Sequence, residues 1–217
     1  MKKKSTRSIF IAVLSLAAFA LWTVLVRTVD VREIGPNGSA VGFAALNGFV
    51  HKLTGVNMTL YTLTDWLGLV PVAAAFGFAI LGAVQWLVRK SIFKVDRSLA
   101  VLGAFYIAVA AAYVLFEIFP VNYRPVLIDG HLEASYPSST TLLVMCIMPT
   151  AAMQACEWIK NKCLKRCIVL TVVFFTAFMI FGRILSGVHW ISDIVGGMLL
   201  SSGLVLCYVF CVNKAKK

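Results

Sequence analysis

The sequence contains six apolar segments, each long enough to cross the hydrocarbon core of a bilayer as a helix. A helix needs about 20 apolar residues to cross that core, because lipid cannot satisfy exposed backbone polar groups. Of the 217 residues, 60% are hydrophobic and 13% are charged, a balance that excludes a soluble globular domain of this length. The sequence therefore predicts an all-α bundle of six transmembrane helices, formed by a single domain over residues 1–217. The expected spans are residues 9–26, 69–88, 99–115, 140–158, 167–181 and 194–212.

The basic residues gather on alternate loops between these segments. Fifteen of the 20 lysines and arginines precede the first segment or follow the second, fourth and sixth, whereas seven of the nine acidic residues fall on the other side. Basic loops stay on the cytoplasmic side, so both termini are predicted to be cytoplasmic, in a protein of the plasma membrane. The formal net charge of +11 thus reflects membrane topology, and no nucleic-acid partner is expected.

The stretch from residue 27 to residue 68 is the longest external loop that this topology predicts. It opens with the turn-forming sequence Gly-Pro-Asn-Gly at residues 35–38. Apolar residues then recur at helical spacing, which predicts a short interfacial helix on the outer leaflet. A re-entrant segment packed on the bundle is the alternative. The apolar residues of this pattern are Phe43, Leu46, Val50 and Leu53.

The first apolar segment is interpreted as a membrane span, and the cysteines as free thiols. A cleaved signal peptide is the alternative to a first span, but about 18 apolar residues exceed a usual signal core and no small-x-small cleavage site follows. All six cysteines fall in spans or on the cytoplasmic side, so no disulfide framework is predicted. Without metal-ligand spacing among cysteines and histidines, neither a metal nor a cofactor is expected.

The segment between the fifth and sixth spans carries three side chains that suit phosphoryl transfer. Arg183 offers a planar, permanently charged fork to phosphate oxygens. A neutral imidazole at His189 can attack phosphorus. If the segment begins a helix, Asp193 shares a face with His189 four residues earlier, where its carboxylate can orient the imidazole.

The loop between the third and fourth spans adds candidate ligands on the same side of the membrane. A proline followed by small hydroxyl residues opens the fourth span, and such a helix start offers free backbone N–H groups to an anion. Structural roles are alternatives, since Ser138 can simply cap the helix and Arg124 can pair with Glu117 or Asp129. The candidate residues of this loop are Glu117, Arg124, His131 and Ser138.

Together these residues resemble the type 2 phosphatidic acid phosphatase and vanadium haloperoxidase superfamily, integral-membrane lipid phosphatase branch. The family's three motifs are K-x6-RP, PSGH and SR-x5-H-x3-D. The third motif matches best: Arg183, His189 and Asp193 stand at the family spacing, with Gly187 before the histidine and Gly182 in place of the leading serine. The resemblance covers residues 100–202 and, in topology, nearly the whole chain.

The first two motifs depart from the family pattern. The first keeps Arg124-Pro125 but has Glu117 where the family has lysine. The second keeps Pro137-Ser138 but has serine and Thr140 in place of glycine and histidine.

The resemblance implies roles for the residues that match. His189 would be the nucleophile that forms a phosphohistidine intermediate, and Asp193 would orient it. Arg124 and Arg183 would hold the phosphoryl oxygens, together with the hydroxyl or N–H of Ser138. No cofactor is implied.

The departure at Thr140 affects the leaving group. In the family the second-motif histidine protonates the leaving oxygen, which threonine cannot do near neutral pH. His131 and Glu117 are the candidate replacement proton donors. Alternatively, the leaving group needs little protonation, as when phosphate leaves a polyprenyl pyrophosphate.

The expected function is therefore an integral-membrane phosphatase of lipid phosphates or pyrophosphates that acts on the extracytoplasmic side. Its partners would be the lipid substrate and the bilayer. Two alternatives remain: a catalytically inactive family member that binds or translocates a lipid phosphate, and an unrelated six-helix transporter. A binding protein has no need of a nucleophile with its orienting carboxylate, which favours the enzyme.

Overall fold

A computed structural model describes residues 2–215, with the side chains of residues 8–215, and this part of the chain forms eight α-helices. Six helical segments of the described part are long and apolar enough to cross a membrane, which confirms the predicted bundle. They are α1 (Lys2–Thr28), α3 (Met58–Leu67) continued by α4 (Leu69–Arg89), α5 (Arg97–Ile118), α6 (Ser139–Trp158), α7 (Lys162–Leu185) and α8 (Ile191–Ala215).

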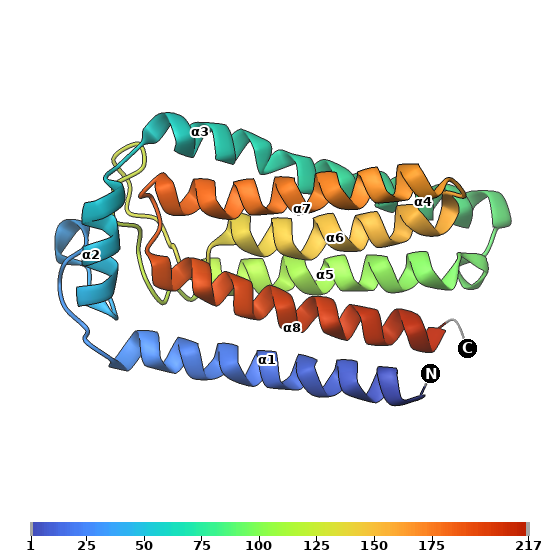
Figure 1. The fold of residues 1–217 in the computed structure, drawn as a ribbon, viewed down its shortest axis with the longest axis horizontal. Coiled ribbons are helices and arrows are strands. Elements are labelled where there is room, and N and C mark those ends of the chain that lie inside the picture. Colours follow the sequence, from blue (N-terminus) through green and yellow to red (C-terminus); the bar gives the residue numbers. More distant parts are fainter. Residues whose placement is uncertain (1, 216–217) are drawn as a thin grey trace.

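Both ends of the described chain lie at one end of the bundle, beside the α4–α5 and α6–α7 connections (Figure 1). The α5–α6 and α7–α8 loops lie at the opposite end, with the start of α3. The basic loops thus share one end and the candidate site residues share the other. The predicted basic side chains of Lys2, Lys3, Lys4 and Arg7, and residues Lys216 and Lys217, lie outside the described part.

The second span begins earlier than predicted. Residues 58–67, expected to be part of the external loop, form α3, which meets α4 at Gly68. Thr64 and Asp65 interrupt the apolar run in this helix, which is why hydropathy did not extend the span. The Thr64 hydroxyl donates to the carbonyl oxygen of Leu60 at 2.9 Å, so the polar side chain is satisfied inside its own helix.

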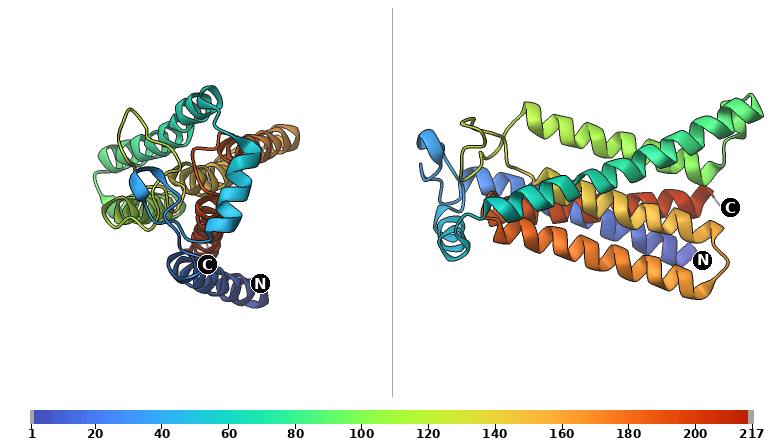
Figure 2. Two further views of the ribbon diagram at one scale, coloured as in Figure 1. Left: turned by 90° about the vertical axis from the view of Figure 1, so that its left-hand side faces the viewer. Right: turned by 90° about the horizontal axis from the view of Figure 1, so that it is seen from above.

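The predicted interfacial helix is α2 (Ala44–Thr54). It lies across the end of the bundle (Figure 2, left). Its apolar side chains Leu46, Phe49 and Leu53 are exposed, whereas Asn47 is buried against the protein. This division fits a helix that rests on the bundle and turns its apolar side toward lipid. The predicted turn before it is a short 3-10 segment, Pro36–Gly38.

The core lies between α5, α6 and α8, where Leu102, Leu142, Cys146 and Leu200 are buried. The helix α1 packs along α8 at the side of the bundle. Gly203 of α8 permits this approach, because a Cβ atom there would lie 2.6 Å from a side-chain carbon of α1.

The helix α6 continues through Pro149. Proline cannot donate a backbone hydrogen bond, so the preceding turn needs other donors. The hydroxyl of Thr150 donates to the carbonyl oxygens of Cys146 and Ile147 at 2.7 and 3.1 Å, and the hydroxyl of Tyr106 on α5 lies 3.5 Å from the latter. Hydroxyl groups thus support the α6 backbone next to the proline.

Candidate active site

The α5–α6 loop forms a hairpin that brings Arg124 toward the end of the bundle. The backbone N–H of Arg124 donates to the carbonyl oxygen of Glu133 at 3.0 Å, and Ile128 and His131 exchange hydrogen bonds across the turn. The turn residues Asp129 and Gly130 both have positive φ, at 48° and 80°. An Asp-Gly pair of this kind favours a tight hairpin, so this sequence sets the register of the loop.

The α7–α8 loop, which carries His189, is held against the segment between α2 and α3. Gly187 has a φ of 64°, and a Cβ atom there would lie 1.8 Å from the carbonyl oxygen of Gly55. The backbone N–H of Asn57 donates to the carbonyl oxygen of Ser186 at 3.0 Å. Only glycine fits position 187 in this arrangement, because both the backbone angle and the close approach exclude a side chain.

A buried asparagine fixes the other end of this loop. Asn47 of α2 donates to the hydroxyl oxygen of Ser192 at 2.9 Å and accepts from the Ser192 backbone N–H at 3.1 Å. Trp190 donates from its indole nitrogen to the carbonyl oxygen of Tyr123 at 2.7 Å, which joins the loop to the hairpin. The loop is therefore held from both sides.

Arg183 is buried at the end of α7, with 1% of its surface exposed. Its Nε donates to the hydroxyl oxygen of Thr140 at 3.0 Å, and its Nη2 donates to the same oxygen. Nη2 also pairs with the carboxylate of Asp65 on α3 at 2.8 Å. The remaining terminal nitrogen, Nη1, is buried without a hydrogen-bond partner among the described residues.

Arg124 approaches the same place from the hairpin. Its Nε lies 3.0 Å from the carboxylate of Glu133, in an ion pair without hydrogen-bond geometry, and its Nη1 is buried without a partner in the described part. The ring of Tyr61 joins the two arginines: its centroid lies 5.6 Å from the guanidinium carbon of Arg124 and 5.0 Å from that of Arg183. Both guanidinium groups thus make cation–π contacts with the same ring, so the two arginines predicted to bind the phosphoryl oxygens lie close together.

His189 is 5% exposed and lies close enough to both arginines for their charges to act on its imidazole. Burial, followed by the charges of Arg124 and Arg183, holds the pKa of its imidazole well below the usual range. Neither ring nitrogen has a partner with good hydrogen-bond geometry in the described structure, and an interaction with the backbone of Ser135 acts only weakly against the lowered pKa. A neutral imidazole with a free nitrogen has the state that a nucleophile requires.

Asp193 does not form the predicted hydrogen bond to His189. Its carboxylate accepts instead from the side chains of Asn122 at 3.0 Å and Ser192 at 3.3 Å, and from the backbone N–H of Trp190 at 3.2 Å. The reason is local: α8 begins at Ile191, so His189 precedes the helix and the expected helical spacing does not apply. In this structure Asp193 holds the helix start and the hairpin.

Ser138 acts as the N-cap of α6, as its alternative interpretation predicted. Its hydroxyl oxygen accepts from the hydroxyl of Thr141 at 3.1 Å, and its backbone N–H donates to the carbonyl oxygen of Asp193 at 3.0 Å. That N–H is therefore not available to a substrate.

The two candidate proton donors are exposed. His131 lies at the hairpin turn, and Glu117 lies on the last turn of α5. Arg124 pairs with Glu133 rather than with Glu117 or Asp129, the partners that the sequence suggested.

Sequence reasoning missed the contribution of α3 to the site. Tyr61 and Asp65 stand four residues apart on one face of that helix, and both contact Arg183. An acidic residue within an apolar run at the membrane edge was the available signal.

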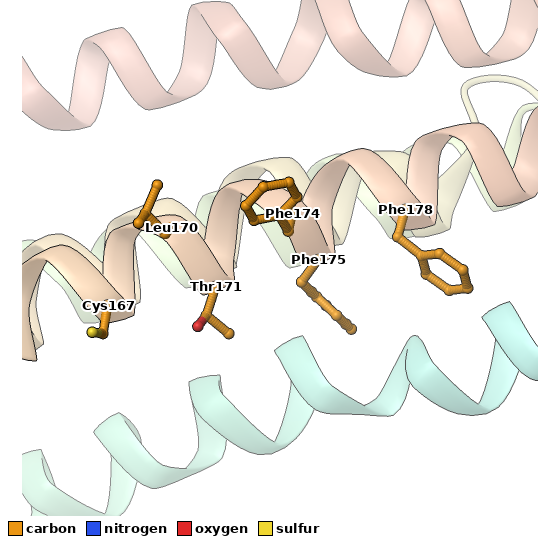
Figure 3. Close-up of a pocket in the computed structure, with 6 residues that line it drawn as sticks. All are labelled: Cys167, Leu170, Thr171, Phe174, Phe175 and Phe178. Atoms are coloured by element: carbon orange, nitrogen blue, oxygen red, sulfur yellow. The ribbon is translucent and has the colours of Figure 1, made fainter.

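A shallow apolar hollow on α7 lies away from this cluster (Figure 3). Its lining is aliphatic and aromatic apart from one threonine hydroxyl and one thiol, so it offers no group suited to phosphate. The lining residues are Cys167, Leu170, Thr171, Phe174, Phe175 and Phe178.

Comparison with known proteins supports the resemblance seen in the sequence. Residues 118–217 match the model of the PAP2 superfamily. The fold is similar to the crystal structure of the first transmembrane PAP2 type phosphatidylglycerolphosphate phosphatase from Bacillus subtilis, with a TM-score of 0.55 and 18% identity over 94% of this chain and 96% of that chain. No curated protein matches significantly. Residues 118–217 are thus similar in sequence to the PAP2 superfamily, and the whole chain, with six candidate membrane spans, has a fold similar to that of a transmembrane PAP2 phosphatase.

Proposed function

We propose that the protein is a phosphatase of lipid phosphates or pyrophosphates, with its site on the extracytoplasmic side and His189 as the nucleophile. One observation carries the proposal. Nitrogen atoms of Arg124, Arg183 and His189 are buried without hydrogen-bond partners in the described part of the chain. Leaving such a group unpaired costs about 1–3 kcal/mol. A phosphoryl group would supply oxygen acceptors to the arginines and phosphorus to the imidazole.

The reaction would proceed in two steps. A nitrogen of His189 would form a bond to phosphorus as the bond from phosphorus to the leaving oxygen breaks. Water would then hydrolyse the phosphohistidine and release phosphate. Arg124 and Arg183 would neutralise the charge of the phosphoryl oxygens in both steps. Asp193 would act indirectly, by holding the hairpin and the loop that carries His189.

A lipid substrate also needs a place for its tail. An apolar cavity of about 680 Å³ lies between α4 and α5, along the membrane-facing part of the bundle. Its lining includes Ala79, Gly82, Gly103 and Ala104, small residues that leave room between the two helices. The cavity reaches Ile92 and Val95 at the α4–α5 connection, the end of the bundle opposite the candidate site, so only the far end of a long lipid tail would lie in it.

Phosphate release by the purified protein tests the proposal. Lipid monophosphates and pyrophosphates should be offered in parallel to the wild type and to His189→Ala, with thermal unfolding used to show that both are folded. We expect release by the wild type alone, and a phosphate adduct on His189 after acid-free quenching. Equal release by both proteins would contradict the assignment.

The alternative of an inactive lipid-phosphate binder is favoured by Thr140, which stands where the family has its acid. In that case no lipid would be hydrolysed, while binding of orthovanadate would still depend on Arg124. Turnover that is abolished in His189→Ala excludes this alternative.

The side of the membrane can be tested separately. A cysteine introduced at Asp129, at the exposed hairpin turn, should react with a membrane-impermeant maleimide in intact cells. A cysteine at Ser91, in the α4–α5 connection, should react only after permeabilisation. A cysteine-free background is needed because three native cysteines are exposed. The reverse pattern would place the site in the cytoplasm.

A further inference from the structure

The proposed site has a nucleophile, His189, and two arginines to bind the phosphoryl group. Thr140 occupies the position of the family's general acid, and it has a different role here. The hydroxyl oxygen of Thr140 accepts from Arg183, and it offers no dissociable proton near neutral pH. If the protein is a phosphatase, as proposed above, its lipid alkoxide still needs a proton. The donor must lie where the two arginines hold the phosphoryl group.

Among the described side chains, four form a hydrogen bond, an ion pair or a cation–π contact with the guanidinium group of Arg124 or Arg183. Two are the carboxylates of Asp65 and Glu133, which are already engaged with the arginines in ion pairs of 2.8 and 3.0 Å. The third is Thr140. The fourth is Tyr61, whose ring is contacted by both guanidinium groups.

We propose that Tyr61 is the proton donor to the leaving oxygen, in the role that the second-motif histidine has in the family. Its phenol carries a dissociable proton. The guanidinium carbons of Arg183 and Arg124, 5.0 and 5.6 Å from the ring centroid, would stabilise the phenolate that forms when the proton leaves. The side chain is partly exposed, so a substrate can reach it.

The position of Tyr61 depends on a second departure from the family motif. Gly182 replaces the leading serine of the third motif, and a Cβ atom there would lie 2.6 Å from the methyl carbon of Thr64. The glycine therefore lets α3 approach α7 closely. That approach brings Tyr61, three residues before Thr64, to Arg183, the next residue after Gly182.

The proton transfer balances over both steps. As the bond between His189 and phosphorus forms, the bond from phosphorus to the lipid oxygen breaks, and this oxygen takes the phenolic proton of Tyr61. The phenolate then removes a proton from the water whose oxygen attacks phosphorus, and the bond to His189 breaks. Phosphate leaves, and both side chains return to their starting states.

Three variants distinguish a Tyr61 that donates a proton from a Tyr61 whose ring only positions the two arginines. Tyr61→Phe keeps the ring and removes the hydroxyl, Tyr61→Leu removes both, and Tyr113→Phe removes a hydroxyl from a partly exposed tyrosine on α5. Turnover of a lipid monophosphate and of the pyrophosphate of the same lipid should be compared, with inhibition by orthovanadate as the measure of anion binding.

We expect Tyr61→Phe to lose about 10²- to 10⁴-fold in monophosphate turnover and far less in pyrophosphate turnover, because a departing phosphate is already a stable anion. Its inhibition by orthovanadate should stay near that of the wild type, while Tyr61→Leu should be inhibited more weakly. The fall of monophosphate turnover at alkaline pH, where a phenol ionises, should also vanish in Tyr61→Phe.

Equal losses on both substrates in Tyr61→Phe, or none, would overturn the assignment of Tyr61 while leaving the phosphatase intact. The same selective loss in Tyr113→Phe would overturn it as well. A wild type as inactive as His189→Ala would overturn the proposed function and, with it, this inference.

Discussion

Arg183 directs two nitrogens, Nε and Nη2, at the single hydroxyl oxygen of Thr140, which lies at the start of another helix. Asp65 takes a further hydrogen bond from Nη2 at 2.8 Å. These contacts fix one edge of the guanidinium fork and leave Nη1 without a partner in the described structure. The family has a general acid at position 140. In this chain Thr140 instead accepts the hydrogen bonds that orient Arg183.

Thr140→Val should therefore weaken substrate binding while preserving the shape of the side chain. A hydrogen bond to a charged donor contributes about 1.5–3 kcal/mol, which corresponds to roughly 10- to 100-fold in kcat/KM. Steady-state kinetics with the preferred lipid would measure it, with Thr62→Val, on an exposed face of α3, as the control. Unchanged kinetics in Thr140→Val would show that Asp65 alone suffices to position Arg183.

The pH dependence of turnover should reflect the depressed pKa of His189. Burial and the charges of Arg124 and Arg183 disfavour the imidazolium form, so the nucleophile should stay neutral below its usual pKa of 6.5. The acid limb of kcat/KM is expected below pH 6.5, and Arg124→Gln should move it to higher pH. A limb above pH 6.5 in the wild type would contradict this.

The same group should couple folding to pH. Because the pKa of His189 is lowered in the folded protein, the unfolded chain binds the extra proton first. The stability that this group contributes is present above pH 6.5 and is lost as the pH falls toward the folded pKa. His189→Gln should reduce this part of the acid sensitivity in thermal unfolding.

Gly187→Ala and Gly130→Ala form a matched pair. Both glycines have positive φ, but an added Cβ atom would lie 1.8 Å from the Gly55 carbonyl oxygen at position 187 and would meet nothing within 4 Å at position 130. Gly130→Ala should cost about 1–2 kcal/mol from backbone strain alone. Gly187→Ala should cost more and should also abolish turnover, because the His189 loop must move. Thermal unfolding in detergent and phosphate release would measure both, and equal effects would show that the loop adapts.

The carboxylates beside the two arginines should compete with an anionic ligand. Asp65 and Glu133 have side chains 57% and 42% exposed, so their ion pairs are screened and contribute little to stability. Asp65→Asn and Glu133→Gln should each strengthen inhibition by orthovanadate about 2- to 5-fold at low salt, and less at high salt. Asp129→Asn, at the hairpin turn, is the control. Weaker inhibition in either variant would show that the carboxylate positions its arginine instead.

Hydropathy located the six spans, because a span needs a long apolar segment whatever its neighbours are. It missed α3, where threonine hydroxyls are satisfied by the helix backbone and do not prevent burial in the bundle. Motif spacing indicated Arg124, Arg183 and His189. The structure places the two arginines on one ring and leaves nitrogens of all three residues buried without hydrogen-bond partners in the described part.

The sequence by itself determined the bundle, its loops and the residue types of the third motif, since these depend on segment length and local spacing. Tertiary structure alone decided which side chains meet Arg183: Asp65, 118 residues away, and Thr140, 43 residues away. It also decided that Asp193 turns to Asn122 and not to His189. Such contacts depend on how each helix is rotated and how deeply it sits in the bundle. Close packing between helices, such as that of Thr64 on Gly182, sets both, and no local sequence pattern contains this information.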